Sequence, residues 1–237
     1  MPIAGNGLRF KKAGYKIFKP LIKVKNTYMF VKASKSFRKK DKWIFILKKN
    51  KFLVELKKII KKKFKKASII TIKKKTDGQA RTVFFANKKL DENTNIFITS
   101  CDTYIEFNKK ELIEKLRCND FLVFVQKPTL FNINNYNNFG WVQINKKKII
   151  KSSCKSKVSS NPKKDWVIVG AFAFRNKKIF SRVLKKLFYS KTKVNNEFYL
   201  DSCIEIARKL KMNVSFIKLK KSISWGTPQE LKKNFYK

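Results

Sequence analysis

The opening of the chain, MPIAGNGLRFKKAGYKIFKP, combines two glycines with basic side chains in a pattern that suits phosphate binding. Gly5 and Gly7 would let backbone N–H groups approach a phosphate closely and form a concave anion site. Arg9 and Lys19 would add fixed positive charge around a triphosphate. A lone G-x-G pair also occurs in ordinary turns, so the interpretation depends on the residues that accompany it.

Two aspartates far apart in the sequence are candidates for metal binding. Asp102 closes the apolar run NIFITSCD, which predicts a buried strand over 95–102, and Asp201 closes the polar stretch NNEFYLD. Two carboxylates that converge beside a phosphate loop would hold Mg²⁺, because this ion keeps waters and binds substrate phosphates. Each also has an ordinary explanation, Asp102 as a turn former or helix cap and Asp201 as an acid in the first turn of a helix.

These residues need a scaffold, and the hydrophobic pattern predicts strands that alternate with helices. The predicted strands include 42–47, 67–72, 95–102, 121–126 and 165–174. The predicted helices include 52–64, 109–117 and 177–189, and 128–138 is predicted to be a loop. Such alternation indicates an α/β fold with a mostly parallel sheet covered on both faces. Ligands bind beyond the carboxyl ends of the strands in such sheets, where the glycine loop would lie.

The charge of the chain is extreme, but its make-up does not favour sequence-specific nucleic-acid binding. The 237 residues include 59 Lys and Arg and 15 Asp and Glu, which gives a formal net charge of +44. Only 7 of the basic residues are Arg, and the lysines are spread along the whole chain. We interpret the charge mainly as a solvated surface shaped by AT-rich codons, with only non-specific attraction to nucleic acid.

Other classes of protein are disfavoured by what the sequence lacks. There is no uninterrupted apolar stretch of about 18 residues, so we expect no membrane span. The N-terminus has no signal-peptide pattern, so we expect a cytoplasmic protein. Four widely spaced cysteines and no histidine argue against a zinc site and against a disulfide framework.

Seven segments, in order from residue 1 to about 233, resemble motifs of the sugar-phosphate nucleotidyltransferases. The opening resembles the signature loop G-x-G-x-R followed by a K-P pair, and TDGQARTVFFA resembles the Gly-Gln segment that contacts the base. IFITSCDTYIEF and NNEFYLDSCI resemble the segments with the two metal-binding aspartates. GWVQINKKKIIKSSCK resembles the hairpin that leads to an E-K pair, VGAFAFRN the G-x-[YF]-x-F strand, and SWGTPQEL the closing G-T-P.

The resemblance implies a Rossmann-like, GT-A-like fold, as a single three-layer α/β/α domain over residues 1–237 with a mostly parallel mixed sheet. It implies transfer of a nucleotidyl group from an NTP to a sugar 1-phosphate or a related phosphate acceptor, which yields an NDP-sugar and pyrophosphate, with Mg²⁺ as cofactor. Both reactants are anions, so catalysis would depend on positioning and charge stabilisation rather than on a protein nucleophile.

The roles of individual residues follow from the same resemblance. Arg9 and Lys19 would be catalytic and stabilise the charge on the phosphates, and Asp102 and Asp201 would bind Mg²⁺. The residues expected to contact the nucleotide are Ala4, Gly5, Gly7, Gly78 and Gln79. Those expected to contact the acceptor are Gly140, Lys155, Gly170 and Glu197. For Gln79, Gly140, Gly170 and Glu197 a helix start, a turn, tight packing and a surface charge are alternative explanations.

Three departures from the family pattern leave other functions open. An apolar first strand of several residues is expected before the glycine loop and is missing after Met1. Phe18 replaces a proline, and Cys154 replaces the glutamate of the E-K pair, which removes a hydrogen-bond acceptor for sugar hydroxyls. A non-sugar acceptor such as a phosphoalcohol, a catalytically degenerate homologue that binds nucleotide, and a basic nucleic-acid-binding protein are the alternatives. The oligomeric state is open.

Overall fold

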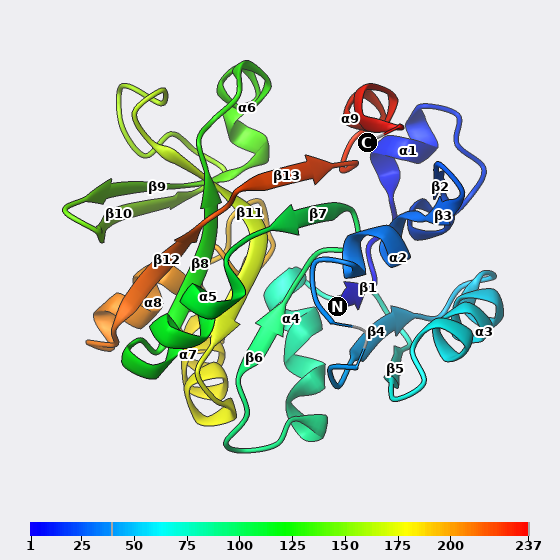
Figure 1. Cartoon of the computed structure of the whole chain (residues 1–237), viewed down its shortest axis with the longest axis horizontal. Helices are drawn as coiled ribbons and strands as arrows, with labels where there is room; N and C mark the ends of the chain where they lie inside the picture. The colour runs from blue at the N-terminus through cyan, green and yellow to red at the C-terminus, as the bar shows by residue number, and fades with distance from the viewer. Residues whose placement is uncertain (39, 237) are drawn as a thin grey trace. The chain divides into compact units, whose positions relative to one another are not determined.

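The computed structural model describes residues 1–38 and 40–236, which separate into two compact units (Figure 1). Unit 1 comprises Met1–Thr76, Thr99–Glu106 and Ser222–Lys237, and unit 2 comprises Asp77–Ile98 and Phe107–Lys221. Each unit has its own cluster of buried apolar side chains. The candidate site residues therefore fall into two groups, one in each unit.

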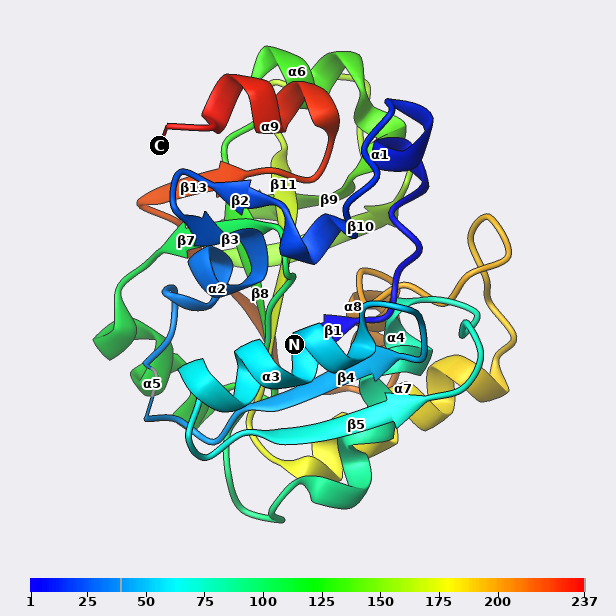
Figure 2. The same cartoon turned by 90° about the vertical axis from the view of Figure 1, so that its right-hand side faces the viewer.

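Unit 1 contains a parallel sheet with the strand order β1-β4-β5. These strands are β1 (Pro2–Ile3), β4 (Ile44–Lys48) and β5 (Ser68–Ile72). Helix α3 (Leu53–Lys63) lies across this sheet in Figure 2 and buries Leu56 and Ile60, which are one helical turn apart. The other elements of unit 1 are α1 (Leu8–Lys12), η1 (Lys19–Leu21), β2 (Lys23–Val24), β3 (Thr27–Tyr28), α2 (Met29–Ser34), β7 (Thr103–Glu106), β13 (Lys221–Ser224) and α9 (Pro228–Asn234).

Aromatic side chains hold the separate segments of unit 1 together. The ring of Phe45 in β4 lies 5.5 Å from Trp43 and 4.9 Å from Phe64, measured between centroids. Trp225, which follows β13, is fully buried in the same core. Its backbone N–H donates to the carbonyl of Asp102 at 2.8 Å. This core and this hydrogen bond fix the loop that carries Asp102 beside the C-terminal segment.

Unit 2 contains a six-stranded mixed sheet with the order β10-β9-β11-β8-β12, and β6 also pairs with β11. Its strands are β6 (Ile96–Ile98), β8 (Phe121–Gln126), β9 (Gly140–Asn145), β10 (Lys148–Cys154), β11 (Trp166–Phe174) and β12 (Val214–Lys218). Strands β8 and β12 are parallel, whereas β11 is antiparallel to β6, β8 and β9. β9 and β10 form the hairpin that the sequence predicts.

Helices cover both faces of the sheet in unit 2. They are α4 (Gln79–Phe84), which continues as η2 (Phe85–Lys89), α5 (Lys109–Cys118), α6 (Leu130–Asn134), η3 (Tyr136–Asn138), α7 (Lys177–Tyr189) and α8 (Cys203–Lys209). Phe121, Val123 and Val125 of β8 belong to the core that α4, α7 and α8 share. Phe124 alternates with them and meets Phe107, just before α5, at 5.0 Å between ring centroids. The strand is thus buried on both faces, as in a three-layer arrangement.

The α/β fold class is confirmed, but two local predictions are wrong. The predicted loop at 128–138 contains α6 and η3, because Thr129 and Asn132 form a reciprocal capping box that starts a helix. The predicted strand at 95–102 is only β6, which ends at Ile98. Asp102 therefore directly precedes β7 instead of ending a long strand. Among the described residues, no helix has the length and apolar character needed to cross a membrane.

Candidate active site

The glycine loop of unit 1 links β1 to α1. Gly7 has φ 64°, in the left-handed region, and a Cβ at this position would lie 3.3 Å from the Cβ of Lys19. A side chain at Gly7 would therefore strain the backbone and crowd Lys19. Gly5 is exposed with open space around it, whereas Ala4 before it is buried. The loop thus presents open backbone beside a lysine, and Arg9 is exposed on α1 just beyond it.

Lys19 forms the central ion pair of unit 1. Its ammonium lies 2.5 Å from the Oδ2 atom of Asp102 and donates to the carbonyl of Gly226 at 3.0 Å. The same ammonium lies 5.2 Å from the ring centroid of Phe10. The side chains of Lys19 and Asp102 are only 16% and 21% exposed. Two residues assigned to different roles, one to phosphate binding and one to metal binding, thus meet directly.

Burial and mutual attraction set the charges of this pair. Burial alone would lower the pKa of Lys19, but the Asp102 carboxylate outweighs it and raises this pKa above its ordinary value. Burial alone would raise the pKa of Asp102, but the Lys19 ammonium outweighs it and lowers this pKa. Both groups are therefore charged at neutral pH. The neighbouring thiol of Cys101 stays neutral, because burial raises its pKa to about 12.

In unit 2 the segment around Asp201 lies against the start of β9. A Cβ added at Gly140 would overlap the Asp201 carboxylate, 2.5 Å from its Cγ atom. Burial raises the pKa of Asp201 to about 6, although the charge of Lys155 and a hydrogen bond with the Cys154 thiol act in the opposite direction. Ionisation of the buried Asp201 carboxyl is thus unfavourable, and strongly shifted pKa values of this kind are typical of functional sites.

The segment that carries Asp201 is also joined to the start of α4. Gly78 has φ 121°, and a Cβ there would collide with the backbone of Phe198. The N–H of Phe198 donates to the carbonyl of Asp77 at 2.7 Å, and the N–H of Ala80 donates to the carbonyl of Phe198 at 3.0 Å. Gly78 and Gln79 are therefore held beside the strap 197–201, which contains Glu197 and Asp201.

Lys155 follows β10 with φ 60°, in the left-handed region. Its ammonium donates to the carbonyl of Asn138 and lies 5.2 Å from the ring centroid of Tyr199. Burial and a hydrogen bond with Glu197 raise the pKa of Tyr199 to about 12, so its hydroxyl is neutral. Tyr199 thus contacts two residues that are expected to bind the acceptor, Lys155 and Glu197.

The structure brings together most of the predicted residues within each unit. Unit 1 joins Gly7, Lys19 and Asp102, and unit 2 joins Gly78, Gly140, Lys155, Glu197 and Asp201. Gly170 has φ 71° and lies where the pairing of β11 with β8 shifts between Ile168 and Phe172. Such a bulge by itself explains a glycine at position 170.

Two contributors were not found from the sequence. Tyr199 stands between the two acids of NNEFYLD, and an aromatic residue there is a weak signal by itself. The carbonyl of Gly226 holds Lys19, although a backbone acceptor leaves no signal in side-chain type. The Gly-Thr-Pro segment 226–228, which contains this carbonyl, is indicated only by the resemblance to the family.

The arrangement at Gly140 gives a testable prediction. We expect Gly140→Ala to lower the free energy of unfolding by about 1–3 kcal/mol, because its Cβ must displace the Asp201 carboxylate. Urea unfolding followed by circular dichroism measures this change. Gly5→Ala is the matched control, since a Cβ there meets no atom within 4 Å. Equal stability of the two variants would contradict the packing described here.

A metal ion that used these carboxylates would need further oxygen ligands. The described residues contain no group of three or more His, Cys, Asp or Glu side chains suited to holding a metal. Asp102 and Asp201 supply one carboxylate in each unit. Mg²⁺ can be bound through a single carboxylate together with substrate phosphates and waters, so either aspartate by itself would suit this ion.

Comparison with known proteins identifies the family and the fold of the chain. Residues 3–232 match the model of the nucleotidyl transferase family. No curated protein matches the sequence. A solved nucleoside-diphosphate-sugar pyrophosphorylase from Vibrio cholerae RC9 is 19% identical with a TM-score of 0.81, over 100% of this chain and 99% of that one.

Two further solved structures share the fold. An inositol-1-phosphate CTP transferase from T. maritima is 16% identical with a TM-score of 0.75, over 99% of this chain and 91% of that one. A UDP-glucose pyrophosphorylase from Acinetobacter baumannii is 15% identical with a TM-score of 0.70, over 99% and 90%. The chain has an α/β fold of the Rossmann-like class. The chain belongs to the nucleotidyl transferase family.

Proposed function

We propose that the protein transfers a nucleotidyl group from an NTP to a sugar 1-phosphate, or to a related phosphate acceptor, and releases pyrophosphate. The observation that supports this most strongly is the position of Lys19, held between the glycine loop and Asp102 in a member of the nucleotidyl transferase family. A positive charge fixed beside open backbone N–H groups suits the stabilisation of a triphosphate during attack at its α-phosphorus.

In this proposal the basic side chains bind the phosphates of the NTP and the acidic side chains bind Mg²⁺. Arg9 and Lys19 would neutralise the triphosphate, with the backbone of Ala4, Gly5 and Gly7 beside them. Gly78 and Gln79 would contact the base. Asp102 and Asp201 remain the proposed Mg²⁺-binding residues, and the ion would supply additional charge neutralisation to the phosphates.

The acceptor would be bound by the group in unit 2. Lys155 would contact its phosphate, and Gly140, Gly170 and Glu197 would line the rest. Cys154 hydrogen-bonds with Asp201, in the position where the family pattern has a glutamate. A thiol is a weak acceptor for sugar hydroxyls, so phosphoalcohols belong in the acceptor panel beside sugar 1-phosphates.

A pyrophosphate-release assay tests the proposal. Each NTP is paired with a panel of sugar 1-phosphates and phosphoalcohols in the presence of Mg²⁺. We expect release with at least one pair and a loss of at least ~100-fold in kcat/KM for Arg9→Ala and for Asp102→Asn. Arg9 would neutralise the phosphates directly, whereas Asp102 would hold the Mg²⁺ that neutralises them. No release across the panel would refute the enzyme. Tight NTP binding without turnover would instead identify a degenerate homologue.

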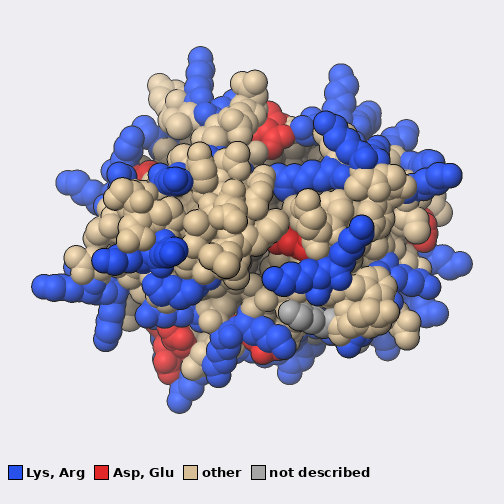
Figure 3. Space-filling model, turned by 90° about the horizontal axis from the view of Figure 1, so that it is seen from above, with Lys and Arg blue, Asp and Glu red and all other residues tan. Residues whose placement is uncertain are grey.

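On the face shown in Figure 3, the surface charge does not favour a sequence-specific nucleic-acid-binding protein over this proposal. Figure 3 shows Lys and Arg side chains spread around the face in view, with Asp and Glu side chains among them, instead of one continuous basic patch. Spread charge predicts weak, non-specific binding that falls steeply with salt.

A further inference from the structure

The segment that precedes Lys19 contains no helix or strand. The chain runs from the end of α1 to the start of η1 through residues 13–18, and Ile17 within it is 56% exposed. The chain after Lys19 is held in place, because Pro20 restricts its own backbone and both Pro20 and Leu21 are buried. The position of the Lys19 backbone therefore depends on what holds the residue before it, Phe18.

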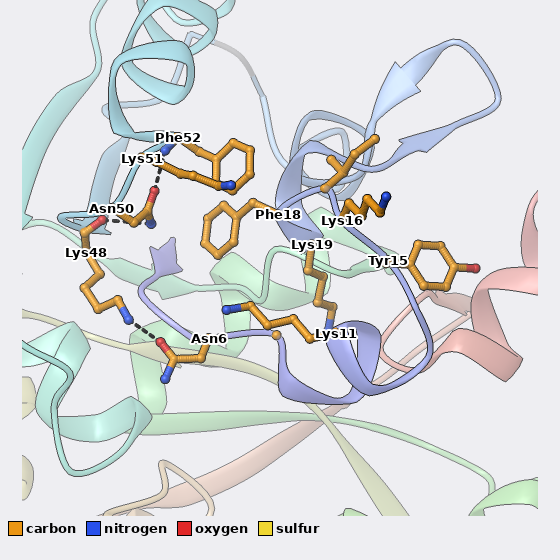
Figure 4. Close-up of a pocket in the computed structure, with 12 residues that line it drawn as sticks. Asn6, Lys11, Tyr15, Lys16, Phe18, Lys19, Lys48, Asn50, Lys51 and Phe52 are labelled. Carbon is orange, nitrogen blue, oxygen red and sulfur yellow. Dashed lines mark hydrogen bonds between the residues drawn. The ribbon is translucent and has the colours of Figure 1, made fainter.

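Phe18 is held by the ring of Phe52. Phe18 is buried, and the two rings are stacked with their centroids 5.8 Å apart and an angle of 10° between their planes. Figure 4 shows the rings next to each other at the edge of a cavity of about 240 Å³, which Gly7 and Lys19 also line. Stacked aromatic pairs gain more than the burial of their area alone. The stack thus joins the segment before Lys19 to the loop after β4.

Phe52 is itself fixed by the sheet of unit 1. Its N–H donates to the Oδ1 atom of Asn50 at 2.8 Å, and its carbonyl accepts from the N–H of Leu56 at 3.0 Å, in the first turn of α3. The Nδ2 atom of Asn50 donates to the carbonyl of Lys48, the last residue of β4, at 3.1 Å. Because β4 is the central strand of its sheet, the ring that Phe18 contacts has a rigid support.

The backbone of Phe18 has the conformation of a proline. Its φ is −62° and its ψ is 127°, and a proline ring fixes φ near −65°. Among residues 1–38 and 40–236, the N–H of Phe18 donates to no backbone carbonyl, so a proline would lose no such hydrogen bond. The carbonyl of Phe18 accepts from the N–H of Leu21 at 2.8 Å and starts η1. Stacking at position 18 therefore maintains the conformation that a proline ring would impose covalently.

We propose that the Phe18–Phe52 pair positions Lys19 for the transfer reaction. This inference rests on the proposed function for the role of Lys19. The stack restricts rotation of the backbone at position 18, so the Lys19 ammonium stays at Asp102 and at the carbonyl of Gly226, beside the glycine loop. A charge held in place stabilises a transition state without reorganisation, and a misplacement of about 1 Å can cost about 100-fold in rate. Both aromatic residues are positioning residues that act through Lys19.

Single substitutions in unit 1 test the pair. The test variant is Phe52→Leu, which removes the stacking partner and leaves an apolar side chain. The matched control is Phe64→Leu, because Phe64 is buried in the same core, 4.9 Å from Phe45 between ring centroids, and does not line the cavity. Both variants lower the urea midpoint through lost packing. Only Phe52→Leu is expected to lower kcat for pyrophosphate release, by at least ~10-fold, whereas the control stays within about twofold of wild type.

Rescue by proline distinguishes positioning from stability. In Phe18→Pro/Phe52→Leu the proline fixes φ without a stacking partner, so kcat should return to within about threefold of wild type. The same variant also loses the buried Phe18 ring, so its urea midpoint should not exceed that of Phe52→Leu. A purely structural role predicts that activity follows stability. A double variant as slow as Phe52→Leu, or a control as slow as Phe52→Leu, would overturn the inference.

Calorimetry with ATP, CTP, GTP, UTP and dTTP separates this inference from the proposed function. Lys19 is proposed to contact the triphosphate, so the Kd of the NTP that binds wild type should rise at least ~5-fold in Phe52→Leu and recover with Phe18→Pro. Turnover that Phe52→Leu leaves within about twofold of wild type refutes the aromatic pair alone. Loss and recovery of NTP affinity in a protein without turnover refutes the proposed function alone. A wild-type protein that binds no NTP refutes both.

Discussion

Replacement of Asp201 by asparagine is expected to stabilise the free protein and at the same time abolish its proposed activity. Burial raises the pKa of the Asp201 carboxyl to about 6, roughly two units above that of an unfolded chain. Ionisation of this group therefore opposes folding at neutral pH. An asparagine side chain fills the same space without the charge, so we expect a gain of about 1–3 kcal/mol in the free energy of unfolding.

The stability gained by Asp201→Asn is expected to depend on pH. A carboxyl whose pKa is higher in the folded state than in the unfolded state binds more protons when folded, so its contribution to stability falls as pH rises from about 4 to about 6. The advantage of Asp201→Asn should be absent below pH 4 and complete above pH 6. Urea unfolding at pH 4, 5, 6 and 7.5 measures it.

The same variant, Asp201→Asn, is expected to lose the proposed activity. We expect at least a ~100-fold lower kcat with Asp201→Asn, because a bound metal commonly contributes several kcal/mol to phosphoryl chemistry. Glu114→Gln is the matched control, since Glu114 is exposed on α5 and the change removes one negative charge. A variant at position 201 that is less stable at pH 7.5, or fully active, contradicts the role given to Asp201.

The parts of the fold that follow local rules were predictable. Helix α7 runs from Lys177 to Tyr189, as the apolar period predicts, and the side chain of Asn176 caps its first turn. Strand β8 coincides with the apolar run 121–126. In both cases the pattern is long and the hydrophobic face is continuous, so local sequence and tertiary packing agree.

The parts that depend on distant contacts were not predictable. Strand β7 pairs with β13, more than a hundred residues later, and this pairing makes a strand of TYIE after Asp102. The short helices α1 and α2 have five and six residues, too few for a period to be recognised. The two-unit division depends on which segments share a core, since residues 99–106 belong with the N-terminal segment.

The candidate site likewise contains residues that the sequence could predict and contacts that it could not. Gly7 and Gly78 could be proposed from sequence because their backbone angles require glycine, and such positions recur as motifs. The pairing of Lys19 with Asp102 crosses 83 positions in sequence. No spacing rule connects two such residues, and only the resemblance placed them in one site.

Loss of the Lys19 ammonium is expected to have the largest effect on stability within unit 1. In Lys19→Met the largely buried Asp102 carboxylate loses its partner at 2.5 Å. Removal of one member of a buried pair commonly costs about 3–5 kcal/mol, and the partial exposure of this pair reduces the expected loss to about 1–3 kcal/mol. Denaturant unfolding at pH 7 measures the difference from wild type.

The pH range and a double variant distinguish this ion pair from simple packing. Lys19 lowers the pKa of Asp102, so the pair stabilises the fold above the unfolded carboxyl pKa of roughly 4, and this contribution is lost as pH falls through the lower folded value. Lys19 itself has a raised pKa, so its contribution persists to high pH and disappears only above its folded value. Adding Asp102→Asn to Lys19→Met should recover at least half of the loss, because it removes the unpaired charge. If the double variant is as unstable as Lys19→Met at pH 7, Lys19 acts through its packing on Phe10 and Gly226, and the electrostatic account of the site fails.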